Sequence, residues 1–183
     1  MKIVLNGCYG GFGLSYYAQA LYLMAQDKIP YFYQDISTYT SDYKRDHCYK
    51  RLNVNEVNQL NGQSYIYCTA THQAPTIFEF PKDIINFSDI DRADPLLVSI
   101  VETIGSDAAS GRFAQLYIEE IPDGTLYQID NYDGMESLVT QDDDDWIVAK
   151  NNSATQETFQ KISNIWQCIK PTEEPDQDLA FKM

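Results

Sequence analysis

The sequence is poor in positive charge. Its 13 Lys and Arg residues stand against 27 Asp and Glu residues, which gives a net charge of −14. A surface of this sign repels polyanions at long range and has too few cations to form a basic stripe. Duplex DNA and duplex RNA are therefore not expected as partners.

Long apolar runs and cysteine pairs are also missing. No stretch approaches the roughly 20 apolar residues that a bilayer span needs, and Met1–Asn6 turns polar too soon for a signal peptide. None of the four cysteines forms a CxxC pair, so neither a zinc knuckle nor a disulfide framework is indicated. We expect a cytoplasmic protein with no membrane partner.

Signatures of catalysis and of metal binding are equally scarce. His47 and His72 lie in different polar segments, with no Cys or carboxylate neighbours at ligand spacing. Cys8 and Ser15 are not part of a G-x-S-x-G motif or a family-specific cysteine signature. The four aspartates at 142–145 lack the alternating carboxylates and the glycine of a calcium loop. We expect no catalytic residues, no metal and no cofactor.

What the chain does contain is the mixture of apolar patterns typical of an α/β protein. Its 183 residues, 44% of them hydrophobic, are enough for one core. The patterns predict a single α/β (mixed α+β) domain over residues 1–170, in which helices pack on one mixed β-sheet. A polar insertion at 37–62 interrupts this domain, with a short helix expected at Asn55–Leu60. Residues 171–183 are predicted to be an acidic flexible tail.

Local signals place the elements of this domain. Asp94 before Pro95 is the strongest helix start, and Gly105 is placed to end that helix. Ala114–Ile121 and Thr125–Asp130 alternate and are joined by Pro-Asp-Gly, which predicts an antiparallel hairpin. The other predictions are strands at Lys2–Asn6, Ile29–Ile36 and Ser64–Thr71, a short extended piece at Thr76–Phe80, helices at Tyr16–Asp27, Pro95–Ile104 and Thr155–Ile169, a loop at Ser106–Arg112, and a turn at Asn131–Gly134 leading into Met135–Thr140.

The first strand runs directly into a glycine-rich loop, Gly7–Gly13. The spacing Gly-xxx-Gly-x-Gly is one that Rossmann-like domains place after their first strand, where amides at the next helix hold a phosphate. No complete alternation of strands and helices follows. Two interpretations therefore remain beside the Rossmann one: a loop that only makes a tight turn, and a loop that places backbone donors beside a small anionic ligand.

The 14 tyrosines are the other unusual feature. A tyrosine ring has a flat apolar face and a polar tip, which suits stacking on a base as well as packing at an interface. Tyr9 and Phe12 lie within the glycine loop, so they are expected to contact a ligand or a partner. Aromatic side chains on both faces of Tyr31–Tyr33 and Tyr65–Tyr67 predict a homo-oligomer, because one small domain has few means to cover both faces.

Four segments carry a family resemblance. They are Asn6–Ser15 (NGCYGGFGLS), Asp91–Leu96 (DRADPL), residues 111–122 beginning Gly-Arg-Phe-Ala, and Tyr132–Glu136 ahead of Trp146. Together they resemble a family of small phage and prophage proteins with a CYGGFGLS opening, over about three quarters of the chain. This chain departs from the family pattern at Asp144–Asp145, where a His-Arg pair is expected before the tryptophan.

The resemblance implies a function in phage evasion of host defence. Such proteins are similar to phage sponges, which sequester cyclic dinucleotide signals of bacterial antiviral systems without catalysis. The resemblance further implies a location in the bacterial host cytoplasm and an oligomer that holds its ligands at or near subunit interfaces.

The residues of these segments suggest individual roles in binding a nucleotide. Amides of Gly10, Gly11 and Gly13 are expected to face a phosphate at the helix start, with Tyr9 and Phe12 flanking a base. The predicted ligand-binding residues are Cys8, Tyr9, Gly10, Gly11, Phe12, Gly13, Ser15, Arg92, Arg112, Tyr132, Asp133 and Glu136.

Several of these roles have structural alternatives. Ser15 is a natural N-cap, and Asp133 a natural turn residue. Arg92 and Arg112 are the candidates for phosphate contacts, but each could instead pair with Asp91 or Asp94 at the helix start. Asp133 and Glu136 are the candidates for reading a base edge or a ribose hydroxyl.

Two other classes of function stay open. One is an enzyme acting on a nucleotide, which predicts that product appears on incubation. The other is an acidic inhibitor of a host defence protein, which would mimic nucleic acid through the aspartate run, the tail and the net charge of −14.

Overall fold

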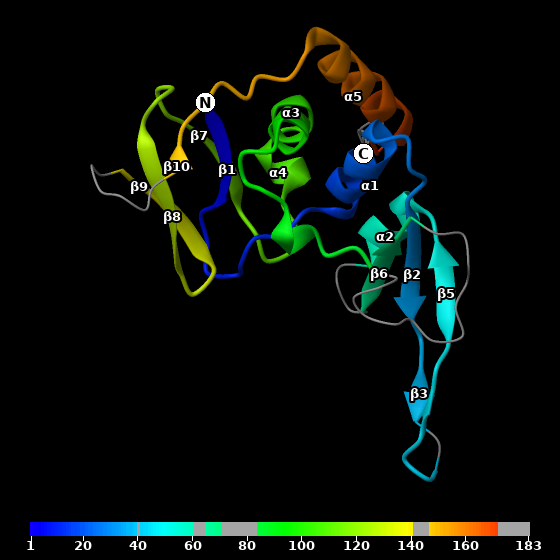
Figure 1. Ribbon diagram of the computed structural model, residues 1–183. Helices are drawn as coiled ribbons and strands as arrows, with labels where there is room; N and C mark the ends of the chain where they lie inside the picture. Colours follow the sequence, from blue (N-terminus) through cyan, green and yellow to red (C-terminus); the bar gives the residue numbers. More distant parts are fainter. Residues whose placement is uncertain (40, 61–64, 71–83, 141–146, 172–183) are drawn as a thin grey trace, which may run out of the picture.

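The computed structural model describes residues 1–39, 41–60, 65–70, 84–140 and 147–171. It is an α+β fold with helices packed against strands, as the sequence predicts. Figure 1 shows the central helices between two groups of strands. The predicted extended piece Thr76–Phe80, the aspartate run and the acidic tail beyond Pro171 lie outside the described residues.

Strand β1 (Lys2–Asn6) is buried on both faces. Ile3, Val4 and Leu5 are all 0% exposed. Because side chains alternate along a strand, Val4 joins the main apolar cluster with the helices, whereas Ile3 and Leu5 pack in a second cluster toward β8 (Leu126–Tyr132). An unbroken apolar run is the pattern of such a doubly covered strand. The glycine loop therefore begins directly at the end of a buried strand.

The predicted hairpin between Ala114–Ile121 and Thr125–Asp130 is wrong in its pairing. Both strands form, but β7 (Leu116–Glu120) pairs antiparallel with β1. Strand β8 pairs instead with β9 (Met135–Thr140) and β10 (Ile147–Val148). Alternation shows which side chains face a core, but it does not identify the strand that shares the hydrogen bonds. β1 has its own backbone groups to satisfy, and β7 satisfies them.

The one mixed sheet is replaced by several antiparallel sheets. Every strand ladder in the described ranges is antiparallel. β2 (Tyr31–Asp35) lies between β5 (Tyr49–Leu52) and β6 (Ile66–Thr69), in a different sheet from β1. The strand–helix–strand opening therefore does not form one sheet. Helix α1 (Tyr16–Ala25) connects β1 in one sheet with β2 in another.

Helix ends follow the local signals. Ser15 caps α1, and Asp94 caps the next long helix, which Gly105 ends at φ +85°. The predicted loop Ser106–Arg112 contains one short helix, and Gly105 is its N-terminal cap residue. No helix within the described ranges is long and apolar enough to cross a membrane. The other helical elements are η1 (Phe87–Asp89), α3 (Pro95–Ile104), α4 (Ser106–Ala109) and α5 (Gln156–Ile169).

The polar insertion at 37–62 extends the β2–β5 pairing. β3 (Thr38–Tyr39) pairs with β4 (Arg45–Asp46), which lengthens the pair into a hairpin arm projecting from the body, as Figure 1 shows. α2 (Val54–Gln59) follows, one residue ahead of the predicted Asn55–Leu60. In the residues that the structure describes, the insertion therefore forms strands β3, β4 and β5 and helix α2.

Candidate functional site

Asn6 fixes the root of the glycine loop. It is 0% exposed, and its Nδ2 donates to the carbonyl oxygens of Cys8 and Gly134, each at 2.7 Å. Its Oδ1 accepts from the backbone nitrogen of Gln115 at 2.8 Å. One side chain thereby joins the end of β1, the β8–β9 turn and the segment before β7. Asn6 was not among the predicted site residues. The sequence feature that could have indicated it is a single polar residue at the end of an apolar strand.

The β8–β9 turn packs against the glycine loop. Asp133 and Gly134 form its two-residue connection, with φ values of +52° and +88°. Positive φ at both positions is type I′ geometry, which favours Asp-Gly, so Asp133 serves the turn. A Cβ on Gly134 would lie 2.5 Å from the Gly11 nitrogen. Gly134 was not among the predicted site residues, yet only glycine fits this contact.

The segment before β7 closes the other side of the loop. A Cβ on Gly10 would lie 1.6 Å from the carbonyl oxygen of Phe113. The Cys8 thiol donates to that same oxygen at 3.1 Å, and the Gly111 nitrogen donates to the Gly13 oxygen at 2.9 Å. The glycine loop is therefore held between two segments that are distant in sequence.

An ion pair between the partly buried Arg92 and the buried Glu136 lies beside Phe12. The Arg92 guanidinium donates to the Glu136 carboxylate through Nε and Nη2, with Nη2 to Oε1 at 2.8 Å. The two side chains are 14% and 4% exposed. Arg92 Nη1 donates to the carbonyl oxygens of Ser88 and Ile90, and its Cζ lies 3.4 Å from the centroid of the Phe12 ring. Four of its five N–H groups thus have partners within the chain.

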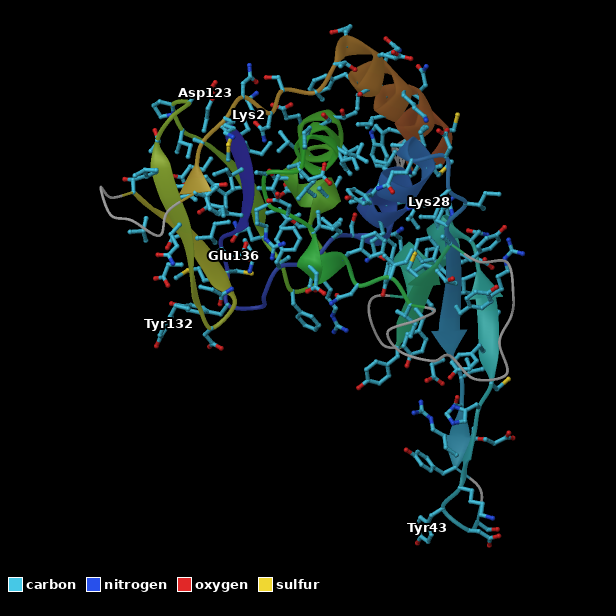
Figure 2. The ribbon with its side chains drawn as sticks, in the orientation of Figure 1. Lys2, Lys28, Tyr43, Asp123, Tyr132 and Glu136 are labelled. Atoms are coloured by element: carbon cyan, nitrogen blue, oxygen red, sulfur yellow. The ribbon has the colours of Figure 1, made fainter. Side chains whose placement is uncertain are left out.

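This ion pair gives Arg92 and Glu136 a structural role. Asp91 and Asp94, the alternative partners, accept from backbone amides of their own turn and helix start instead. Glu136 also accepts from the Asn6 nitrogen at 3.1 Å. Figure 2 shows the contrast along β8–β9, where Glu136 points inward and Tyr132 points away from the body. Ligand contacts by Arg92 or Glu136 would require breaking these bonds.

The start of α1 lies against residues 108–111. Ser15 Oγ accepts from the Ala18 nitrogen as the helix cap and donates to the Ala108 oxygen at 2.6 Å. The Ser15 nitrogen donates to the Ala109 oxygen, and Leu14 forms a β-bridge with Ser110. Ser15 is thus a positioning residue, and the exposed part of the site lies elsewhere.

That exposed part, which we call the aromatic edge, consists of Tyr9, Arg112, Phe113 and Tyr132. The three rings are 62%, 64% and 71% exposed in that order, and the rings of Tyr9 and Tyr132 meet edge to face with centroids 6.5 Å apart. Arg112 Cζ lies 4.8 Å from the centroid of the Phe113 ring. Burial raises the pKa of Tyr16, while the positive charge of Arg112 partly offsets the rise. Arg112 therefore lies within electrostatic reach of α1.

The comparisons with known proteins give no match. No protein-family model, curated protein or solved structure is similar to this chain. In the part of the chain that the structure describes, no group of three or more His, Cys, Asp or Glu side chains could hold a metal ion. The aromatic edge offers a ligand exposed π faces, one guanidinium and a backbone loop held from both sides.

Proposed function

We propose that the chain captures a small phosphate-bearing nucleotide at the aromatic edge and holds it without turnover. The observation that carries the proposal is the exposure of Tyr9, Phe113 and Tyr132 around a loop that buried contacts hold in place. Stacking on an aromatic side chain contributes about 1–3 kcal/mol per base. A loop fixed before binding also lowers the ordering cost of association.

Arg112 is the proposed phosphate contact. An arginine fork binds phosphate oxygens bidentately, and such charge-assisted hydrogen bonds are stronger than neutral ones. The net charge of −14 opposes an anionic ligand, but charges beyond a Debye length of about 8 Å are largely screened. A local guanidinium therefore outweighs distant carboxylates.

The proposed ligand class is a cyclic dinucleotide or a related signal, sequestered by a phage protein in the cytoplasm of its bacterial host. Support comes from the four segments that resemble the phage family, because they meet here. Asn6–Ser15 forms the loop, and Asp91–Leu96 contributes Arg92 beneath it. The segments beginning at Gly111 and Tyr132 hold its two sides. We propose that the chain acts as a homo-oligomer.

A thermal-shift panel tests this function. Cyclic dinucleotides, NAD derivatives and ADP-ribose are each added to the protein, and the ligand is recovered after denaturation for chromatography. We expect at least one nucleotide to raise the unfolding temperature and to be recovered intact. Recovery of a converted product would assign the chain as a nucleotide-acting enzyme instead. No shift across the panel would reject the proposal and favour the acidic inhibitor of a host defence protein.

Replacing Arg112 with alanine is expected to weaken nucleotide binding at least tenfold. The loss corresponds to about 1.5–3 kcal/mol, the range for a hydrogen bond to a charged group. Calorimetric titration with the nucleotide that gives the largest thermal shift measures it. Lys28→Ala is the matched control, because Figure 2 places this exposed cation far from Tyr132, and its affinity should equal that of the parent. Equal affinity in Arg112→Ala would remove Arg112 from the site.

A further inference from the structure

The hairpin arm, defined here as residues 36–51, exposes apolar surface. Tyr43 is 91% exposed, Tyr39 71% and Ile36 43%. Figure 2 places Tyr43 at the far end of the arm, away from the helices. A two-stranded ribbon is only marginally stable by itself, and large exposed apolar side chains on a projection are available for contact with a partner. The arm therefore has the form of a docking element.

Asp35 joins the two strands at the base of the arm. Its side chain is 3% exposed, accepts from the Ser37 nitrogen at 2.9 Å and pairs with Arg45 at 2.5 Å across the ribbon. Burial acts to raise the pKa of Asp35, but hydrogen bonds from Ser37 and the charges of Arg45 and His47 hold that pKa below its usual value. The carboxylate thus stays ionised at neutral pH and holds the two strands of the arm together. A ribbon that is ordered before docking lowers the ordering cost of association.

The arm and the rest of the chain carry opposite charges. Residues 36–51 hold four Lys and Arg side chains and two Asp side chains, a net charge of +2. The rest of the chain must then carry −16 to reach the total of −14. Complementary charges of this kind steer association and select the partner.

We propose that the arm of one copy docks on the acidic body of a second copy of this chain. This inference rests on the proposed homo-oligomer and names the element that builds it; it is independent of nucleotide binding. A nucleic acid is the weaker occupant, because the body beside the arm repels a polyanion. The arm adds a second reason for an oligomer: of the aromatic residues behind the first reason, Tyr31 and Tyr33 are 6% and 1% exposed, whereas Tyr65 is 78% exposed.

Light scattering on the full chain tests the arm. At micromolar protein and low salt, the parent should have a mass of at least twice 21 kDa. The variants Tyr39→Ser/Tyr43→Ser and Lys44→Glu/Lys50→Glu should fall to 21 kDa while keeping the unfolding temperature of a folded chain. Lys28→Glu makes the same kind of charge change on the body and should keep the parent mass. Added salt should shift the parent toward 21 kDa, because it screens the attraction.

The outcomes separate this inference from the proposed function. A parent of 21 kDa overturns both the homo-oligomer and the arm as its basis. Arm variants that keep the parent mass overturn the arm alone. A parent that purifies with nucleic acid, and loses it in the arm variants, overturns the second copy as occupant. Nucleotide titrations of the same samples report on the aromatic edge, which the arm substitutions leave intact.

Discussion

Replacing Arg92 with alanine is expected to lower the free energy of unfolding by about 3–5 kcal/mol, the range for removing one partner of a buried ion pair. The loss is large because Glu136, at 4% exposure, would keep a buried charge without its counterion. The carbonyl oxygens of Ser88 and Ile90 would lose their donor, and Phe12 would lose the guanidinium beside its ring. Urea unfolding of the parent and the variant measures the difference.

Arg112→Ala is the matched control for that experiment. It removes an arginine from the same site at an exposed position, so the loss of stability should be smaller than for Arg92→Ala, within the roughly 0–1 kcal/mol typical of an exposed charge interaction. Arg92→Lys should give an intermediate loss, because lysine keeps the charge without the planar fork. If Arg92→Ala unfolds at the same urea concentration as Arg112→Ala, the ion pair does not hold the site together.

Replacing Gly10 with alanine is expected to destabilise the protein by about 3 kcal/mol, the upper part of the usual range for overpacking. The new Cβ would lie 1.6 Å from the Phe113 carbonyl oxygen, which belongs to the backbone and cannot rotate away. The glycine loop and the segment that contains Phe113 must therefore move apart, and the geometry of the aromatic edge is lost. Nucleotide affinity should fall together with stability.

Gly13→Ala supplies the control for Gly10→Ala within the same loop. A Cβ on Gly13 has nothing within 4 Å, so this variant should stay within about 0.5 kcal/mol of the parent. Chemical denaturation measures both variants. Equal stability of Gly10→Ala and Gly13→Ala would contradict the close packing of the loop on Phe113.

The elements that the sequence predicts well are those set by local chemistry. β1 occupies Lys2–Asn6 as expected, because its apolar run needs cover on both faces. Ser15 and Asp94 begin their helices and Gly105 ends one in the predicted way, since capping depends on neighbouring residues only. Strand pairing depends on distant residues, so the predicted hairpin was wrong although both of its strands form.

The residues of the site show the same difference between local signals and tertiary contacts. The glycine loop and the Asp-Gly turn are visible as short motifs, and both form. That Arg92 pairs with Glu136 could not be predicted, because the two residues are 44 positions apart and their contact depends on tertiary packing. Phe113 and Gly134 were missed as site residues for the same reason: their contacts with Gly10 and Gly11 are tertiary.

The most direct test of the account is a calorimetric titration of Tyr132→Ser beside Tyr65→Ser, with the nucleotide that stabilises the parent most. Both tyrosines are exposed, Tyr132 at 71% and Tyr65 at 78%, but only Tyr132 belongs to the aromatic edge. We predict that Tyr132→Ser loses about 1–3 kcal/mol of binding, roughly a 5- to 150-fold weaker Kd, while Tyr65→Ser binds like the parent. Parent-like affinity in Tyr132→Ser, or an equal loss in both variants, would contradict nucleotide binding at the aromatic edge.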